Sequence, residues 1–90
     1  MKLEVITPES HVFTGEVNAV SLPGSDGVFQ VLNNHAPIIS SLKEGVVRIE
    51  GADKSEISNP AITKNDAFLE IKIRGGVAEL MNNKLIVLAD

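Results

Sequence analysis

The sequence contains no cysteine, no tryptophan and no tyrosine, and its only aromatic residues are three phenylalanines. Without cysteine the chain can form neither a disulfide nor a thiolate metal site, as is usual in a reducing compartment. Because aromatic side chains are so few, aliphatic side chains must build the core. A chain of 90 residues removes only about 60% of its unfolded surface from water. We therefore expect a single domain over residues 1–90, with little room for a deep cleft.

The sequence also lacks a long apolar run and a basic stripe. No stretch approaches the roughly 18 apolar residues of a membrane-spanning helix, and MKLEVITPE at the N-terminus lacks the apolar run and cleavage site of a signal peptide. Its 8 basic and 12 acidic residues give a net charge of −4, and the basic residues are scattered. Phosphate backbones bind to clustered cations. We therefore expect a soluble, cytoplasmic chain that neither binds nucleic acid nor inserts into lipid.

Residue patterns for catalysis and for metal or cofactor binding are missing as well. The only histidines, His11 and His35, form no HxH or HxxxH pair, and no pattern marks a nucleophile with its base and orienting acid. The glycines of PGSDG and RGG precede strand patterns, so they cannot form the phosphate cradle that requires a helix N-terminus. We expect no catalytic residue, no metal and no cofactor.

Period-2 alternation is the dominant pattern that the sequence does contain. Leu69, Ile71 and Ile73 alternate with charged residues, as expected of half-buried antiparallel strands. Turn motifs follow at short, regular intervals, among them TPES, PGSDG, NNHAP and MNNK. Asn82-Asn83 suits a two-residue hairpin turn. The pattern predicts an all-β sandwich or barrel with almost no helix, and an exposed strand pair or long loop over residues 51–66.

The stretch GVFQVLNNHAPIISSL places His35 between two asparagines and a proline. Pro37 favours an extended conformation at Ala36 and cannot donate to a ladder, so HAP should lie at a strand start or sheet edge. His35 then lies in a loop, where two interpretations stay open. Its imidazole either locks the turn through a bond to nearby backbone or contacts a partner, since binding residues concentrate on such loops.

A second motif, IEGADKSEI, is somewhat similar to the hairpin that carries lipoyl groups, in which a lysine follows an aspartate at a turn tip. In such hairpins a single residue separates the acidic residue from the Asp-Lys pair, whereas here Gly51 and Ala52 intervene. A solvated turn explains the motif more simply. A lipoyl-type carrier domain modified at Lys54 is therefore the alternative function.

The chain resembles the N-terminal β-sandwich of the epsilon subunit of bacterial F-type ATP synthase in three segments: MKLEVITPESHVFTGEV, SLPGSDGVFQVLNNHAPIISSLKEGVVRI and GGVAELMNNKLIVLAD. The shared motifs, in order, are F-[ST]-G, the PGSDG turn, H-A-P, G-V-V-R-I and the Gly-Gly pair that leads to V-L-A-D. Each is weak alone, but their order and spacing make the resemblance specific.

The resemblance implies a two-sheet sandwich of about ten short, antiparallel strands with no chemistry of its own. It implies a structural coupling subunit of the central stalk that links the gamma subunit to the c-subunit ring, within a complex on the cytoplasmic face of the bacterial inner membrane. The implied contacts with the ring loops are Ser25, Asp26, Gly27 and Val28. Those implied near gamma and the ring are Thr7, Pro8, Glu9, His35, Ala36 and Pro37.

The sequence departs from the family pattern at several positions. Family members usually carry an acidic residue where this chain has Val28, and Pro-Gly or Pro-Asn where it has Asn33-Asn34. They commonly continue past V-L-A-D into a helical hairpin, to which inhibition and nucleotide binding are attributed. We therefore expect this sequence, which ends at Asp90, to act without an inhibitory arm or an ATP site.

Overall fold

The computed structural model describes residues 1–52, 59–65 and 68–90, and all of its regular elements are strands. They are β1 (Lys2–Ile6), β2 (His11–Glu16), β3 (Ala19–Gly24), β4 (Gly27–Leu32), β5 (Ile38–Leu42), β6 (Gly45–Glu50), β7 (Ile62–Lys64), β8 (Phe68–Ile73), β9 (Gly76–Met81) and β10 (Lys84–Ala89). The prediction of an all-β fold of about ten short strands is confirmed.

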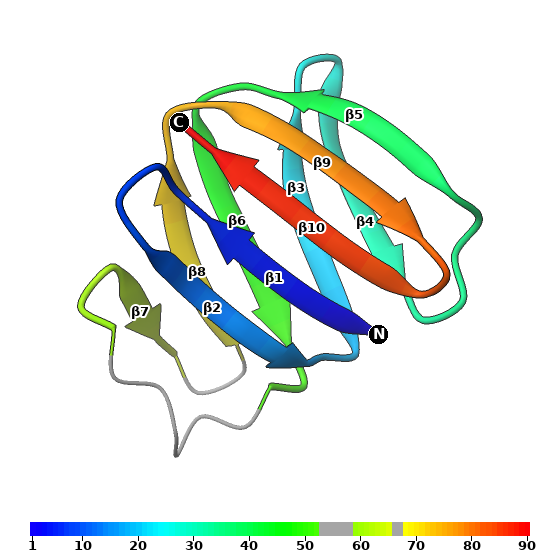
Figure 1. Ribbon diagram of the computed structural model, residues 1–90, viewed down its shortest axis with the longest axis horizontal. Coiled ribbons are helices and arrows are strands. Elements are labelled where there is room, and N and C mark those ends of the chain that lie inside the picture. Colours follow the sequence, from blue (N-terminus) through cyan, green and yellow to red (C-terminus); the bar gives the residue numbers. More distant parts are fainter. Residues whose placement is uncertain (53–58, 66–67) are drawn as a thin grey trace.

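The strands lie in two layers (Figure 1). The front layer has the order β2-β1-β10-β9-β5, and the rear layer contains β4, β3, β6, β8 and β7. Gly24 of β3 pairs with Leu42 of β5, so the two layers belong to one hydrogen-bonded sheet that folds back on itself. The predicted sandwich is thus a continuous sheet with its apolar faces turned inward.

All strand pairs are antiparallel except that of the first and last strands. β1 and β10 run parallel, with Leu3 beside Leu85 and Val5 beside Val87. A parallel pair cannot be closed by a hairpin and needs a long connection. Here the rest of the domain provides that connection, which explains why local pattern predicted antiparallel neighbours only.

The core lies between the layers and is aliphatic, as the composition predicts. Phe13 is the one phenylalanine among the buried hydrophobic residues, while Phe29 and Phe68 are partly exposed. Leu69, Ile71 and Ile73 point inward, as their alternation predicts. The largest fully buried side chains are Leu3, Leu22, Ile49, Leu69, Leu80, Leu85, Val5, Val20, Val31, Val47 and Val87.

Several turns have the backbone that their sequences predict. Asn82 and Asn83 adopt φ of 52° and 59° and connect β9 to β10 as a two-residue hairpin turn. β5 begins at Ile38, directly after Pro37. Within the polar region 51–66, Ile62–Lys64 pairs with β8 as β7, and residues 53–58 and 66 lie outside the described part.

Candidate protein-binding surface

The outward face of the front layer is rich in exposed apolar side chains. Ile39 is 75% exposed, Met81 55%, Leu88 53% and Val77 42%. Ile6 and Ile86, on β1 and β10, are partly exposed at outward positions of the same layer. We call this set, together with Glu79, the front face; its members are Ile6, Ile39, Val77, Glu79, Met81, Ile86 and Leu88. Large apolar patches of this kind mark protein-binding sites.

Strand register sets these side chains side by side. Leu88 lies between Ile6 of β1 and Val77 of β9. In the next row, Glu79 lies between Ile86 of β10 and Ile39 of β5. Cross-strand neighbours have Cβ atoms only about 5 Å apart, so the apolar surface is continuous across four strands.

Sequence reasoning did not select the front face, although β9 and β10 carry a signal for it. In GGVAELMNNKLIVLAD, Ala78, Leu80, Leu85 and Val87 point into the core, yet the intervening positions are largely apolar too. Strands that are apolar on both faces are typical of sheets covered on both sides. This signal indicates that something covers the front layer.

The predicted contact residues Ser25–Val28 form the β3–β4 turn and the first residues of β4. The Ser25 backbone N–H donates to the Ser41 carbonyl at 2.9 Å, which fixes the turn against β5. The turn and β5 enclose a depression of about 260 Å³. It is lined by Gly24, Ser25, Asp26, Gly27, Phe29, Ile39, Ser40 and Ser41. Ile39 of the front face borders this depression, so the tip of the turn adjoins the front face. Val28 is 77% exposed on the rear layer, where it lines a separate depression with Val46.

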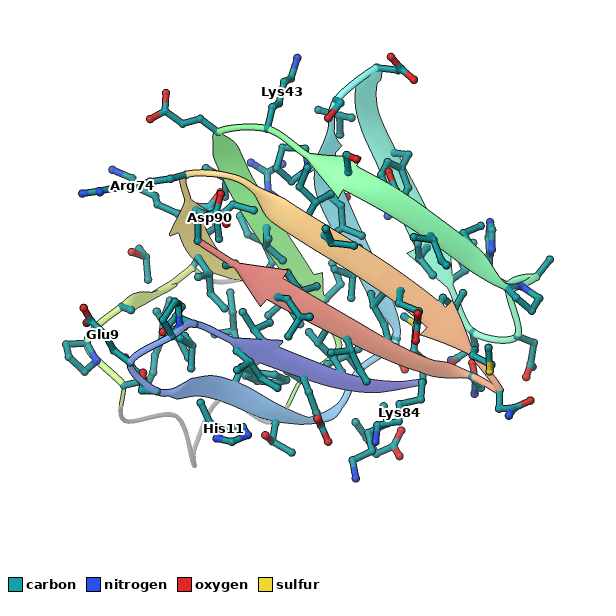
Figure 2. The ribbon with its side chains drawn as sticks, turned by 45° about the horizontal axis from the view of Figure 1, so that its top comes forward. Glu9, His11, Lys43, Arg74, Lys84 and Asp90 are labelled. Atoms are coloured by element: carbon teal, nitrogen blue, oxygen red, sulfur yellow. The ribbon has the colours of Figure 1, made fainter. Side chains whose placement is uncertain are left out.

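Thr7, Pro8 and Glu9 form the tip of the turn between β1 and β2. Backbone N–H groups of Thr7 and Ser10 donate to each other's carbonyls, at 2.9 and 3.3 Å, which makes the turn tight. Glu9 projects from this turn, and Glu9 and Lys84 lie at opposite ends of the β1–β10 pair (Figure 2). This turn therefore borders the front face next to Ile6.

The loop with His35, Ala36 and Pro37 leads directly into the first residue of β5, Ile38. The His35 backbone N–H donates to the Leu32 carbonyl at 3.2 Å, and its ring Nδ1–H donates to the Ala36 carbonyl at 2.7 Å. Because a carbonyl only accepts, this bond places the proton on Nδ1. All three residues are exposed. The structure thus contains the local hydrogen bond that would lock the turn. Among the described residues none bonds Nε2, so this ring nitrogen is available to a partner protein.

The His35 loop is fixed by two asparagine side chains. Asn33 Oδ1 accepts a hydrogen bond from the Met1 ammonium, and Asn83 Oδ1 accepts one from the Asn34 N–H at 2.8 Å. Asn34 itself has φ of 63°. The loop is thus anchored to the start of β1 and to the β9–β10 turn, which are the neighbouring elements of the front layer.

The structure does not gather the ten predicted contact residues into one cluster. Ser25–Val28 and His35–Pro37 lie at opposite ends of β5, and Thr7–Glu9 lies across the sheet beyond β1 (Figure 1). What the three segments share is the front face between them. Lys54, on which the lipoyl alternative depends, lies outside the described residues.

Charged side chains of the front layer gather at the end where β1 begins. Glu4 is approached by Lys2 Nζ at 3.8 Å and by Lys84 Nζ at 3.6 Å. Glu16 lies 3.4 Å from the Met1 ammonium. In the described part of the chain, by contrast, Glu79 forms neither an ion pair nor a hydrogen bond. The apolar part of the front face therefore contains one carboxylate, that of Glu79, which no cation of the described residues pairs with.

Comparison with known families identifies the domain. The model of the ATP synthase delta/epsilon chain β-sandwich domain matches residues 1–90. The chain belongs to this family. Its sequence and its ten-stranded fold agree with the resemblance inferred from the F-[ST]-G, PGSDG and H-A-P motifs, which is thereby confirmed.

Curated relatives are epsilon chains of ATP synthase. The chain is 42% identical over 89 residues to that of Chlorobium limicola, covering 99% of this chain and 88% of the relative. It is 39% identical over 90 residues to that of Campylobacter concisus, where it covers 60% of the relative, and 34% identical to that of Desulforamulus reducens, where it covers 58%. The chain therefore spans most of the length of some relatives and little more than half of the length of others.

Solved structures share the fold at low sequence identity. A chain of the Tetrahymena thermophila mitochondrial ATP synthase central stalk and c-ring matches with a TM-score of 0.75 and 11% identity, over 98% of this chain and 61% of that one. A chain of the Euglena gracilis mitochondrial ATP synthase matches with a TM-score of 0.75 and 17% identity, over 97% and 48%. At these identities the likeness concerns the fold.

The domain is thus an epsilon-type chain of ATP synthase, a membrane-associated complex. Within residues 1–52, 59–65 and 68–90, no helix is long and apolar enough to cross a membrane.

Proposed function

We propose that this chain is a structural coupling subunit of the rotary F-type ATP synthase, which joins the gamma subunit of the central stalk to the c-subunit ring and performs no chemistry of its own. The observation that carries the proposal is the front face, with four exposed apolar side chains in one continuous surface. A permanent partner gains from covering such a surface, because obligate interfaces are the more hydrophobic ones.

The chemistry of each surface suggests its partner. The apolar front face suits gamma, with which a stalk subunit would stay associated. The polar turn Ser25–Val28, with its depression beside Ser40 and Ser41, suits the polar loops of the c-ring. Thr7–Glu9 and the His35–Pro37 loop border the front face and would add contacts to gamma or the ring. The complex would lie at the cytoplasmic face of the bacterial inner membrane, and the subunit would need no cofactor.

A pull-down against purified gamma, with and without the c-ring, tests the proposal. We expect the parent chain to capture gamma, and Val77→Gln to weaken that capture because Val77 lies in the front face. With gamma alone, Val46→Gln is the matched control, since Val46 is a valine of similar exposure, 37% against 42%, on β6 of the rear layer. The control applies without the c-ring only, because Val46 lines a depression with Val28, one of the residues implied to contact the ring. Failure of the parent chain to bind gamma in either setting would contradict the proposed function. Equal binding of gamma by both variants and the parent would count against the front face as the docking surface.

A further inference from the structure

We infer that the surface of gamma which covers the front face carries a lysine or arginine side chain opposite Glu79. This inference rests on the proposed function, because it assumes that a protein partner covers the front face. Beyond the proposed function, the inference specifies that the partner must present a positive charge, and that Glu79 is the residue of this chain that selects for it.

Apolar side chains surround Glu79 on every near side. Ile86 of β10 and Ile39 of β5 lie directly opposite it in the two neighbouring strands. Val77 and Met81 flank it along β9, on the same face of the sheet. A partner that packs against these side chains must also cover the carboxylate at their centre.

Glu4 and Glu79 lie in the same row of the sheet, one on each side of Ile86. Lys84 is the nearest basic residue to Glu79 in the strand register, lying opposite Met81, but its Nζ is directed to Glu4. Lys2 is directed to Glu4 as well. Glu4 thus has two cations of its own chain, and Glu79 has no ion pair within the part of the chain that the structure describes.

Covering an unpaired carboxylate opposes binding. In the free chain Glu79 is exposed and water solvates its charge. A partner that removed this water without replacing it would leave a buried, uncompensated charge, which is strongly unfavourable. A basic side chain opposite Glu79 restores the lost interaction and also fixes the orientation of the two surfaces. Arginine fits best, since its fork can bond both carboxylate oxygens.

The test uses the F1 sector of the same ATP synthase, assembled without this chain, as the binding probe. Glu79→Gln keeps the shape of the side chain and removes its charge. We expect it to weaken binding at least about tenfold, because close charge pairs in interfaces couple by about 1.5 kcal/mol or more. Glu50→Gln is the matched control, since Glu50 is also an exposed strand carboxylate but lies on β6 of the rear layer. It should bind within about twofold of the parent.

A third variant asks whether the cation comes from the chain itself. If Lys84 turned to Glu79 in the complex, Lys84→Gln would weaken binding as much as Glu79→Gln does, and the inference would be overturned. We expect Lys84→Gln to change the affinity by less than about threefold. We also expect added salt to weaken binding of the parent more than that of Glu79→Gln.

The outcomes separate the inference from the proposed function. Absence of binding by the parent removes the proposed function itself. Tight binding by the parent, with equal or tighter binding by Glu79→Gln, leaves the proposed function intact and shows that no cation faces Glu79. Weakening confined to Glu79→Gln supports the inference.

Discussion

Asn83 accepts a hydrogen bond through its side chain from the backbone N–H of Asn34, at 2.8 Å, although 49 positions separate the two residues. Both adopt positive φ, 59° at Asn83 and 63° at Asn34. One asparagine therefore shapes the β9–β10 turn and also holds the loop that leads to His35. The position of His35 thus depends on a turn that is distant in sequence.

The first prediction isolates this bond. Glycine accepts positive φ without strain, so Asn83→Gly preserves the turn and removes only the side chain. We expect it to lower the free energy of unfolding by about 1 kcal/mol, the usual contribution of one hydrogen bond. Asn82→Gly, in the same turn, is the control and should cost less. Urea denaturation gives both values, and faster amide exchange at Asn34 in Asn83→Gly alone would locate the effect.

The second prediction concerns the Met1 ammonium, which lies at a buried position. It donates to the Val17 carbonyl at 3.2 Å and to Asn33 Oδ1, and Glu16 lies 3.4 Å away. Asn33→Ala removes one partner of this charged group, and we expect a loss of about 2 kcal/mol, as is typical for hydrogen bonds to charged groups. The affinity tag belongs at the C-terminus in this experiment, so that the ammonium stays free.

Glu16→Gln is the comparison for Asn33→Ala. The Glu16 side chain is 80% exposed, so solvent screens its ion pair with Met1 and its contribution should be well below about 1 kcal/mol. If Asn33→Ala lowers the free energy of unfolding in urea no more than Glu16→Gln does, the hydrogen bond to Asn33 contributes no more than a screened surface ion pair. Asn33 would then have no special part in fixing the loop.

Much of the fold follows from local rules and could be predicted from the sequence. Alternation along Leu69–Ile73 identified its core face, because neighbouring positions differ sharply in polarity. Asn82-Asn83 identified its hairpin, since few residues tolerate positive φ. Pro37 marked the start of β5 for a similar reason. In each case a few adjacent residues contain all of the information.

The surface that carries the proposed function was harder to predict. Val77 and Leu88 face outward although they are apolar, and alternation cannot tell two faces apart when both are hydrophobic. Pairing of β1 with β10 brings Ile6 beside Leu88, and no local pattern contains that pairing. The isolation of Glu79 from Lys84 likewise emerges only once the register of three strands is known.

The third prediction concerns Gly76, the first residue of β9. Its φ is 143°, and a Cβ at this position would lie 2.1 Å from the Leu88 carbonyl oxygen. Because that atom belongs to the backbone of β10, it cannot move aside without breaking the β9–β10 pair. We expect Gly76→Ala to cost at least about 2 kcal/mol of stability.

Gly27 provides the control for Gly76. It also has a positive φ, 135°, yet a Cβ there would meet no atom within 4 Å. Gly27→Ala therefore reports backbone strain without the steric clash, and thermal melting of the two variants separates the terms. If Gly76→Ala and Gly27→Ala lose equal stability, the clash with β10 contributes nothing to the requirement for glycine at position 76.

The last prediction decides between the two interpretations of His35. The ring is exposed, and its Nδ1–H bonds the carbonyl of the adjacent Ala36, so this bond is largely open to water and should contribute little to stability. The anchors of the loop are Asn33 and Asn83 instead. We therefore expect His35→Ala to leave the melting temperature of the isolated domain nearly unchanged and to weaken its assembly with gamma and the c-ring. His35→Asn, which can still donate to Ala36 but lacks Nε2, should weaken assembly equally. A lower melting temperature with unchanged assembly would instead show that His35 serves only to lock its own loop.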